Sequence, residues 1–132
     1  AIDISGTDMF VDNIQIRNFG DKGISSGEKS HLIGRYIELS GGEIAVACKD
    51  NSIVEVDNID ISDCKLAFVV FQKKPEYGPA SIIASNFSEK KVEKIHLIEV
   101  GSSLSVNGVQ LEDKTENVRE MLYGQLFGKS SK

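Results

Sequence analysis

The chain has little of what marks several classes of protein. Its 132 residues include no tryptophan, two prolines and two cysteines. No run of about 18 apolar residues occurs, so we expect no membrane span. The net charge of −5 has the wrong sign for a protein whose main partner is nucleic acid. The sequence opens with AIDISGTDMF, which lacks the basic and apolar regions of a signal peptide and begins inside a pattern. We therefore expect a processed chain or a piece of a longer one.

The usual motifs of metal binding and catalysis are also missing. The two histidines, His31 and His96, lie far apart in the sequence, and neither has a second ligand at the spacing of a zinc site. The sequence holds no Gly-rich phosphate loop and no nucleophile elbow. We therefore predict no catalytic residue, no metal and no cofactor.

What the sequence does contain is a repeat with a period of about 22 residues, within the range of known repeat proteins. Each unit opens with a small residue followed by a large apolar one, as in Gly23-Ile24-Ser25-Ser26. Equivalent quartets begin at Ala1, Ala45 and Ala67. A period of this length indicates a repeat architecture, in which each unit buries its apolar side against its neighbours.

Two further series run beside the first. One consists of serines that each precede a short apolar segment: Ser30, Ser52, Ser81 and Ser103. The other consists of triplets that alternate apolar and polar residues, as half-buried strands do: Ile14-Gln15-Ile16, Ile37-Glu38-Leu39 and Ile59-Asp60-Ile61. Asparagines recur just before this series at Asn13, Asn58 and Asn86, and Tyr36 interrupts them. Three strand-like segments in each unit predict an all-β fold, a parallel β-helix of about 4–5 coils whose equivalent residues lie about 4.8 Å apart.

The pattern is interrupted after Phe71 and changes near the C-terminus. The segment 72–80 is longer than its counterparts by seven and holds both prolines, so we expect a projecting loop. Beyond it, Ile95-His96-Leu97-Ile98 falls out of strict register. Val106-Asn107-Gly108-Val109 predicts a type I′ hairpin. Asp113 is the expected N-cap of a short helix, which Gly128 ends. The apolar face of that helix carries Val118, Met121, Leu122 and Leu126.

These features predict one domain, with the β-helix at residues 1–111 and a capping helix and tail at 112–132. We expect the hairpin and helix to cover the open end of the coil stack, where an exposed strand edge would promote aggregation. The alternative is a helix that docks a partner.

One repeat unit carries a resemblance to a known family. The residues Gly23, Ile24, Ser25, Gly27, Glu28 and Ser30 resemble the right-handed parallel β-helix repeat proteins of the pectin-lyase-like superfamily. The sequence is also similar to β-helix segments of bacterial surface-associated proteins. The resemblance implies a right-handed coil, a polysaccharide ligand and an extracytoplasmic location, at the bacterial surface or secreted. Polygalacturonase-like members carry paired aspartates on adjacent coils, and this sequence does not reproduce the pair.

Two groups of residues are candidates for ligand binding. Glu38 and Asp60 occupy the same outward position of neighbouring coils, where two carboxylates can share a cation or catalyse glycoside hydrolysis. The loop offers Lys73, Lys74, Glu76 and Tyr77 to an anionic or sugar ligand. For both groups the alternative is an ordinary solvated surface.

A third candidate is an apolar strand face. If Val46 and Phe68 point inward, alternation turns a small set of apolar residues outward: Ala45, Ala47, Ala67, Val69 and Phe71. Such a patch predicts contact with the C-terminal helix, with the folded-back loop or with a homodimer partner. The two cysteines are too far apart to form a disulfide. In the repeat, Cys64 aligns with Gly42, which lies six positions before Cys48. Both are expected as free thiols, with Cys48 in the core.

Three functions remain open on these grounds. The preferred one is a non-catalytic binding or structural module, associated with carbohydrate or a cell surface and derived from a larger protein. The second is a fragment of a polysaccharide lyase or glycoside hydrolase. The third is a self-association domain.

Overall fold

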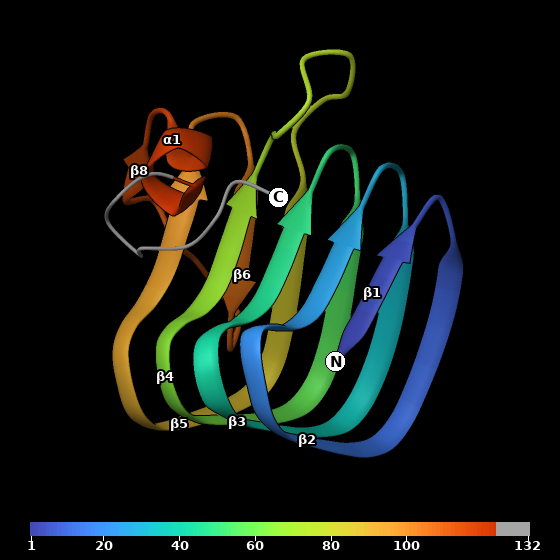
Figure 1. The fold of residues 1–132 in the computed structure, drawn as a ribbon, viewed down its shortest axis with the longest axis vertical. Coiled ribbons are helices and arrows are strands. Elements are labelled where there is room, and N and C mark those ends of the chain that lie inside the picture. The colour runs from blue at the N-terminus through green and yellow to red at the C-terminus, as the bar shows by residue number, and fades with distance from the viewer. Residues whose placement is uncertain (124–132) are drawn as a thin grey trace.

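A computed structural model, whose described residues are 1–123, shows an all-β chain with one mostly parallel sheet (Figure 1). Its strands are hydrogen-bonded in the order β1-β2-β3-β4-β5-β6-β7, and β8 pairs with β5. The long strands β2–β5 bend round and stack side by side, which fits the predicted parallel β-helix (Figure 1). The elements are β1 (Ile2–Ser5), β2 (Asp8–Gly27), β3 (His31–Lys49), β4 (Ile53–Phe71), β5 (Ser81–Glu99), β6 (Ser103–Val106), β7 (Val109–Gln110), β8 (Lys114–Thr115) and α1 (Val118–Tyr123).

The strand register follows the rows that the repeat predicts. Ile2 pairs with Ile24, which pairs with Val46, which pairs with Phe68. The triplets are in register as well, since Ile14 pairs with Ile37 and Ile37 with Ile59. The predicted hairpin is also present, because β6 and β7 pair in antiparallel fashion across Asn107 and Gly108. Both turn residues have positive φ, as a type I′ turn requires.

The register differs from the prediction after the loop at residues 72–80. His31 pairs with Ile53, and Ser81 pairs with Ile53 rather than with Ser52 as the serine series predicted. The loop therefore lengthens the interval between paired positions by six, not by the expected seven. With this offset the register continues, because Phe68 pairs with His96. The expected loss of register in this region was wrong.

Buried hydroxyl groups hold the chain where one long strand passes to the next. Ser30 Oγ accepts a hydrogen bond from the backbone N–H of Thr7 at 3.2 Å, and Ser52 Oγ accepts one from Ser30 at 3.1 Å. Ser102 Oγ does the same for Ala80 at 3.0 Å. These serines are almost fully buried, so each hydroxyl satisfies a backbone donor that would otherwise be costly to bury. The row is thus Ser30, Ser52, Ala80 and Ser102, not the predicted series through Ser81 and Ser103.

A second kind of corner uses the left-handed backbone conformation. Asn13, Asn58 and Asn86 have φ of 60°, 57° and 51°, in the region that asparagine tolerates best after glycine. Their neighbours pair strand to strand, so the three occupy one corner row. Tyr36 occupies the same row with φ of 55°. It is the one aromatic residue with positive φ in the described chain.

Two hydrophobic clusters lie on opposite sides of the strand wall. The inner cluster contains Ile24, Val46 and Phe68 and fills the space that the bent strands enclose. The ring of Phe68 meets that of Phe87 edge-on, with centroids 5.0 Å apart. The outer cluster contains residues of β3, β4 and β5 together with the helix: Ile44, Ala47, Leu66, Val69, Phe71, Leu97, Val118 and Leu122.

The two clusters correct one expectation and confirm another. Ala45 and Ala67 belong to the inner cluster, because strict alternation fails where the strand turns its corner. The helix packs with Ala47, Val69 and Phe71 of the outer cluster, which confirms the predicted contact between that apolar face and the C-terminal helix. It begins at Val118, since Lys114–Thr115 forms β8 instead of a first helical turn after Asp113. Leu126 and Gly128 lie outside the described residues.

The helix contact can be tested by truncating Leu122, which is 4% exposed in the outer cluster. We expect Leu122→Ala to lower the free energy of unfolding by about 2–4 kcal/mol, measured by urea denaturation. The control is Ile83→Ala, at a side chain 45% exposed, which should cost less than about 1 kcal/mol. Equal effects of the two substitutions would contradict the packing of α1 on this face.

Candidate binding groove

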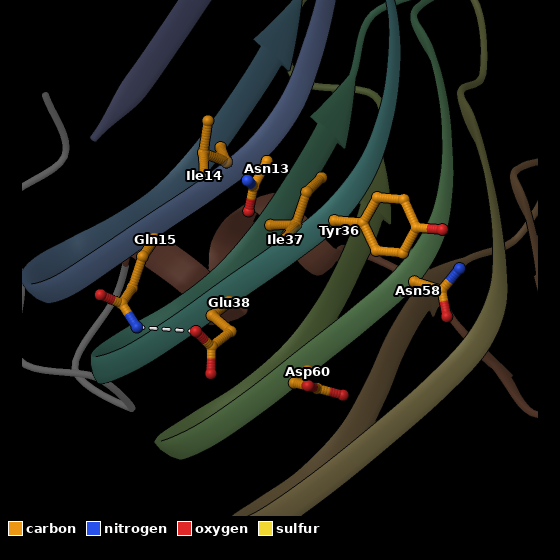
Figure 2. Close-up of a pocket in the computed structure, with 8 residues that line it drawn as sticks. All are labelled: Asn13, Ile14, Gln15, Tyr36, Ile37, Glu38, Asn58 and Asp60. Atoms are coloured by element: carbon orange, nitrogen blue, oxygen red, sulfur yellow. Dashed lines mark hydrogen bonds between the residues drawn. The ribbon is translucent and has the colours of Figure 1, made fainter.

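A groove opens along the corner that holds Tyr36, and we call it the Tyr36 groove. It has a volume of about 540 Å³ and crosses β2, β3 and β4 (Figure 2). Its lining residues are Asn13, Ile14, Gln15, Tyr36, Ile37, Glu38, Asn58 and Asp60. Polar groups from three parallel strands thus face one hollow, next to a single aromatic ring.

The two predicted carboxylates both lie in this groove. Glu38 pairs in register with Asp60, as their positions in the repeat predicted. Gln15 Nε2 donates a hydrogen bond to Glu38 Oε1 at 2.6 Å (Figure 2), and Ser88 Oγ donates one to Asp60 Oδ1. The result is a continuous row of donors and acceptors across β2–β5, with adjacent members about one strand spacing apart, roughly 4.8 Å.

Of the eight lining residues, the sequence predicted Glu38 and Asp60 as site residues, and Tyr36 is the most conspicuous of the six that it did not. Its side chain is 56% exposed, although the residue adopts a backbone conformation that disfavours a bulky side chain. The available signal was its position, since it replaces asparagine in an otherwise regular series. A break in a row of asparagines does not by itself distinguish a binding residue from an irregular corner.

The loop at residues 72–80 does not join this groove, because none of its residues lines it. Its backbone is anchored to the turn between β3 and β4. The N–H groups of Lys73 and Lys74 donate to Asp50 Oδ1 at 2.7 and 2.9 Å. The Lys74 ammonium forms an ion pair with Glu28. Glu76 is exposed, whereas Tyr77 is half-buried and its backbone N–H donates to the Lys74 carbonyl at 3.1 Å. Of the four predicted loop residues, Glu76 alone is classed as exposed.

The Lys74–Glu28 pair perturbs both groups. A hydrogen bond from Lys74, with a second from Ser5, lowers the pKa of Glu28. The hydrogen bond to Glu28 in turn raises the pKa of Lys74. The pair therefore tethers the loop to the turn that follows β2, two strands away in the sheet.

The residues predicted for self-association are not presented at the surface. Ala45, Ala47, Ala67, Val69 and Phe71 are all fully buried within this chain. Self-association through that face stays a prediction.

Within residues 1–123 no group of three or more His, Cys, Asp or Glu side chains is arranged to hold a metal ion. In the same part of the chain no helix has the length and apolar character needed to cross a membrane.

No family model, curated protein or solved structure matches this chain. The groove and its chemistry are therefore the basis on which a function can be assigned.

The cysteines are free thiols, as predicted, and their burial makes them inert. Burial raises the pKa of the Cys48 thiol to about 12. Burial, followed by the charge of Asp63, raises the pKa of Cys64 to about 11. At pH 8 both are protonated, and the thiolate is the reactive form.

We expect neither thiol to react with iodoacetamide at pH 8 in the folded protein, and both to react once urea unfolds it. Mass spectrometry of the labelled chain measures this. Rapid labelling of either cysteine before unfolding would show that its site is more open than the structure indicates.

The tether of the loop should depend on pH. Because the folded pKa of Glu28 is lowered, the pair stabilises the fold above the unfolded pKa of glutamate, about 4.3, and this contribution is lost as pH falls through the folded value. We expect Lys74→Met to lower the urea midpoint at pH 7 and to make little difference at pH 2.5. Lys94→Met, at an exposed lysine of β5, is the control. A Lys74→Met effect that is unchanged at pH 2.5 would contradict the ion pair.

Proposed function

We propose that this chain is a non-catalytic binding module, a right-handed parallel β-helix of the pectin-lyase-like type with rungs of about 22 residues and about 4–5 coils. Its Tyr36 groove binds carbohydrate. The family likeness, the rung size and an extracytoplasmic location rest on the repeat and on the resemblance of the sequence. The binding role rests on the groove, and above all on the conformation of Tyr36.

The placement of Tyr36 works against stability. A side chain with a Cβ in the left-handed region costs about 1 kcal/mol or more, and asparagine reduces that cost by local hydrogen bonding. Asn13, Asn58 and Asn86 occupy the equivalent corners. A tyrosine at this corner, more than half exposed, gains little from core packing in return. Strained backbone with no structural return is typical of residues that serve binding.

The chemistry of the groove suits a sugar. An exposed tyrosine ring offers an apolar face for the C–H groups of a pyranose, and its hydroxyl remains available for hydrogen bonding. Amides of Asn13, Gln15 and Asn58 supply donors and acceptors, and Glu38 and Asp60 supply acceptors. Because polar groups recur from strand to strand, an extended glycan lying along the stack meets similar partners at each strand.

The same geometry leaves hydrolysis as the weaker alternative. Glu38 and Asp60 each already accept a side-chain hydrogen bond, from Gln15 and Ser88 respectively. A glycosidase needs one carboxyl group protonated as an acid and the other as nucleophile or base. Two carboxylates held as acceptors in one polar row favour ligand recognition over this division of roles.

The decisive variant is Tyr36→Asn, which restores the asparagine row. We expect it to raise the free energy of unfolding by about 1 kcal/mol in urea denaturation, because the strain is relieved. We also expect it to weaken glycan binding at least tenfold, measured on a glycan array and then by calorimetric titration of the strongest glycan. Phe10→Ala is the matched control, since Phe10 is 61% exposed but lies outside the groove. Its binding should equal that of the parent.

Two outcomes would overturn the proposal. Unchanged glycan binding in Tyr36→Asn would remove the groove from the function. Release of products from a polysaccharide, lost in Glu38→Gln or Asp60→Asn, would establish the hydrolase or lyase instead.

A further inference from the structure

A second hollow lies on the same outer strand face that α1 covers, but nearer the N-terminus of the chain. The helix covers this face over β3–β5, and the hollow lies beside β1 and β2. The outer row there runs from Asp3 to Ser25 to Ala47. Ala47 belongs to the apolar cluster under the helix, whereas Ser25 and Asp3 lie beyond it. One strand face thus changes from apolar to polar along the stack.

Two adjoining cavities, of about 420 and 170 Å³, open over the polar part. Both are lined by Asp3, Lys49 and Lys73. Lys22 completes one of them and Lys74 the other. We call this region, defined by Lys22, Lys49, Lys73 and Lys74, the basic hollow. Its four lysines come from β2, from the end of β3 and from the loop, so segments distant in sequence build it together.

Lys49 is held in the hollow by its surroundings. Its Nζ donates a hydrogen bond to Ser25 Oγ at 3.3 Å, and Ser25 is almost fully buried. Its side chain passes over Gly27, where a Cβ would lie 2.9 Å from Lys49 Cε and 3.2 Å from Cγ. The absence of a side chain at Gly27 therefore makes room for the lysine stem. An ammonium group has three donors, and the hydrogen bond to Ser25 uses one.

The acids that line the two cavities are fewer than the lysines. Asp21 pairs with Lys22 at 3.2 Å, and Glu28 pairs with Lys74, so both of these carboxylates lie beside the outer two lysines. Asp3 is the acid that lines both cavities together with Lys49. The backbone of Lys73 is fixed by its hydrogen bond to Asp50, which preorganises the loop side of the hollow. The lining therefore holds four lysines against three carboxylates, and Glu28 also interacts electrostatically with Lys49.

We propose that the basic hollow binds an oxyanion at Lys49, on the side that faces the loop at Lys73. The chemistry recognised is that of a carboxylate, sulfate or phosphate group, which accepts hydrogen bonds from ammonium donors around a compact charge. The group has two sources, an acidic saccharide or a free inorganic anion. The proposal goes beyond the proposed function, because no residue of the Tyr36 groove lines the hollow.

The experiment titrates the whole chain with sodium sulfate, inorganic phosphate and trigalacturonate at constant ionic strength, with sodium chloride and the methyl ester of trigalacturonate as blanks. Binding is followed by NMR shifts of Ser25 and Lys49 and by calorimetry. We expect saturable binding that Lys49→Met weakens at least tenfold. Gly27→Ala keeps every charge but displaces the Lys49 stem, and it should weaken binding by a similar factor. Gly27 has no positive φ, so alanine is compatible with its backbone.

The matched control is Lys94→Met, which removes the same charge from an exposed lysine in the outer row of Lys22. Its binding should change less than twofold, and Tyr36→Asn should leave anion binding intact whatever it does to glycans. Tighter binding of trigalacturonate than of the inorganic anions assigns the hollow to acidic saccharides, and the reverse assigns it to free anions. Shifts no larger than those with sodium chloride, or equal losses in Lys94→Met and Lys49→Met, would overturn the proposal. Lys73→Met provides the same test should Lys49→Met fail to fold.

Discussion

The structure depends on one constraint, the in-register parallel pairing of long, bent strands. Because each backbone group bonds to the equivalent strand beside it, every side chain stacks on its counterpart at about 4.8 Å. Ile24 lies against Val46 and Val46 against Phe68, so one position in the repeat decides the character of a whole row. Apolar rows turned inward give the core, and the left-handed corners at asparagine let the strands bend without losing their pairing.

The same stacking repeats polar side chains along the surface, from one strand to the next. A polar residue at an outward position is followed by another on the next strand, so Gln15, Glu38 and Asp60 form a row and not an isolated group. A row is a surface suited to an extended ligand, whereas a catalytic site needs side chains of different roles at one point. Tyr36 departs from its row by placing one aromatic group at a corner where the fold favours asparagine. In the proposed function it is therefore the position at which ligand binding and backbone stability make opposite demands.

The sequence predicted the rows because burial and pairing act with the same period, and it was least accurate where that period is broken. The sequence aligns Ser81 with Ser52, although the true counterpart of Ser52 is the neighbouring Ala80. The predicted loop is therefore one residue too long, because a serine next to the true position fits the pattern equally well. Strict alternation predicts Ala45 on the outer face, but the alternation fails at a corner of the strand and Ala45 lies in the inner cluster. The groove acids were predicted from register alone. The basic hollow was not, because Lys49 and Lys73 line the same cavities only through the path of a loop, which no local pattern determines.

The outer face shows how one carboxylate organises both ends of this arrangement. Glu99 accepts a hydrogen bond from the Gln72 backbone N–H at 2.9 Å and another from that of Val118 at 3.2 Å. The first bond fixes the start of the loop that carries Lys73, and the second fixes the start of the helix that covers Val69 and its neighbours. An exposed apolar face of this kind must be covered, whereas the polar face beside it can stay open to a ligand. Glu99 thus bonds both to the helix that buries the apolar part of the strand face and to the loop that brings Lys73 to the polar part. The burial of one part and the basic character of the other therefore depend on the same carboxylate.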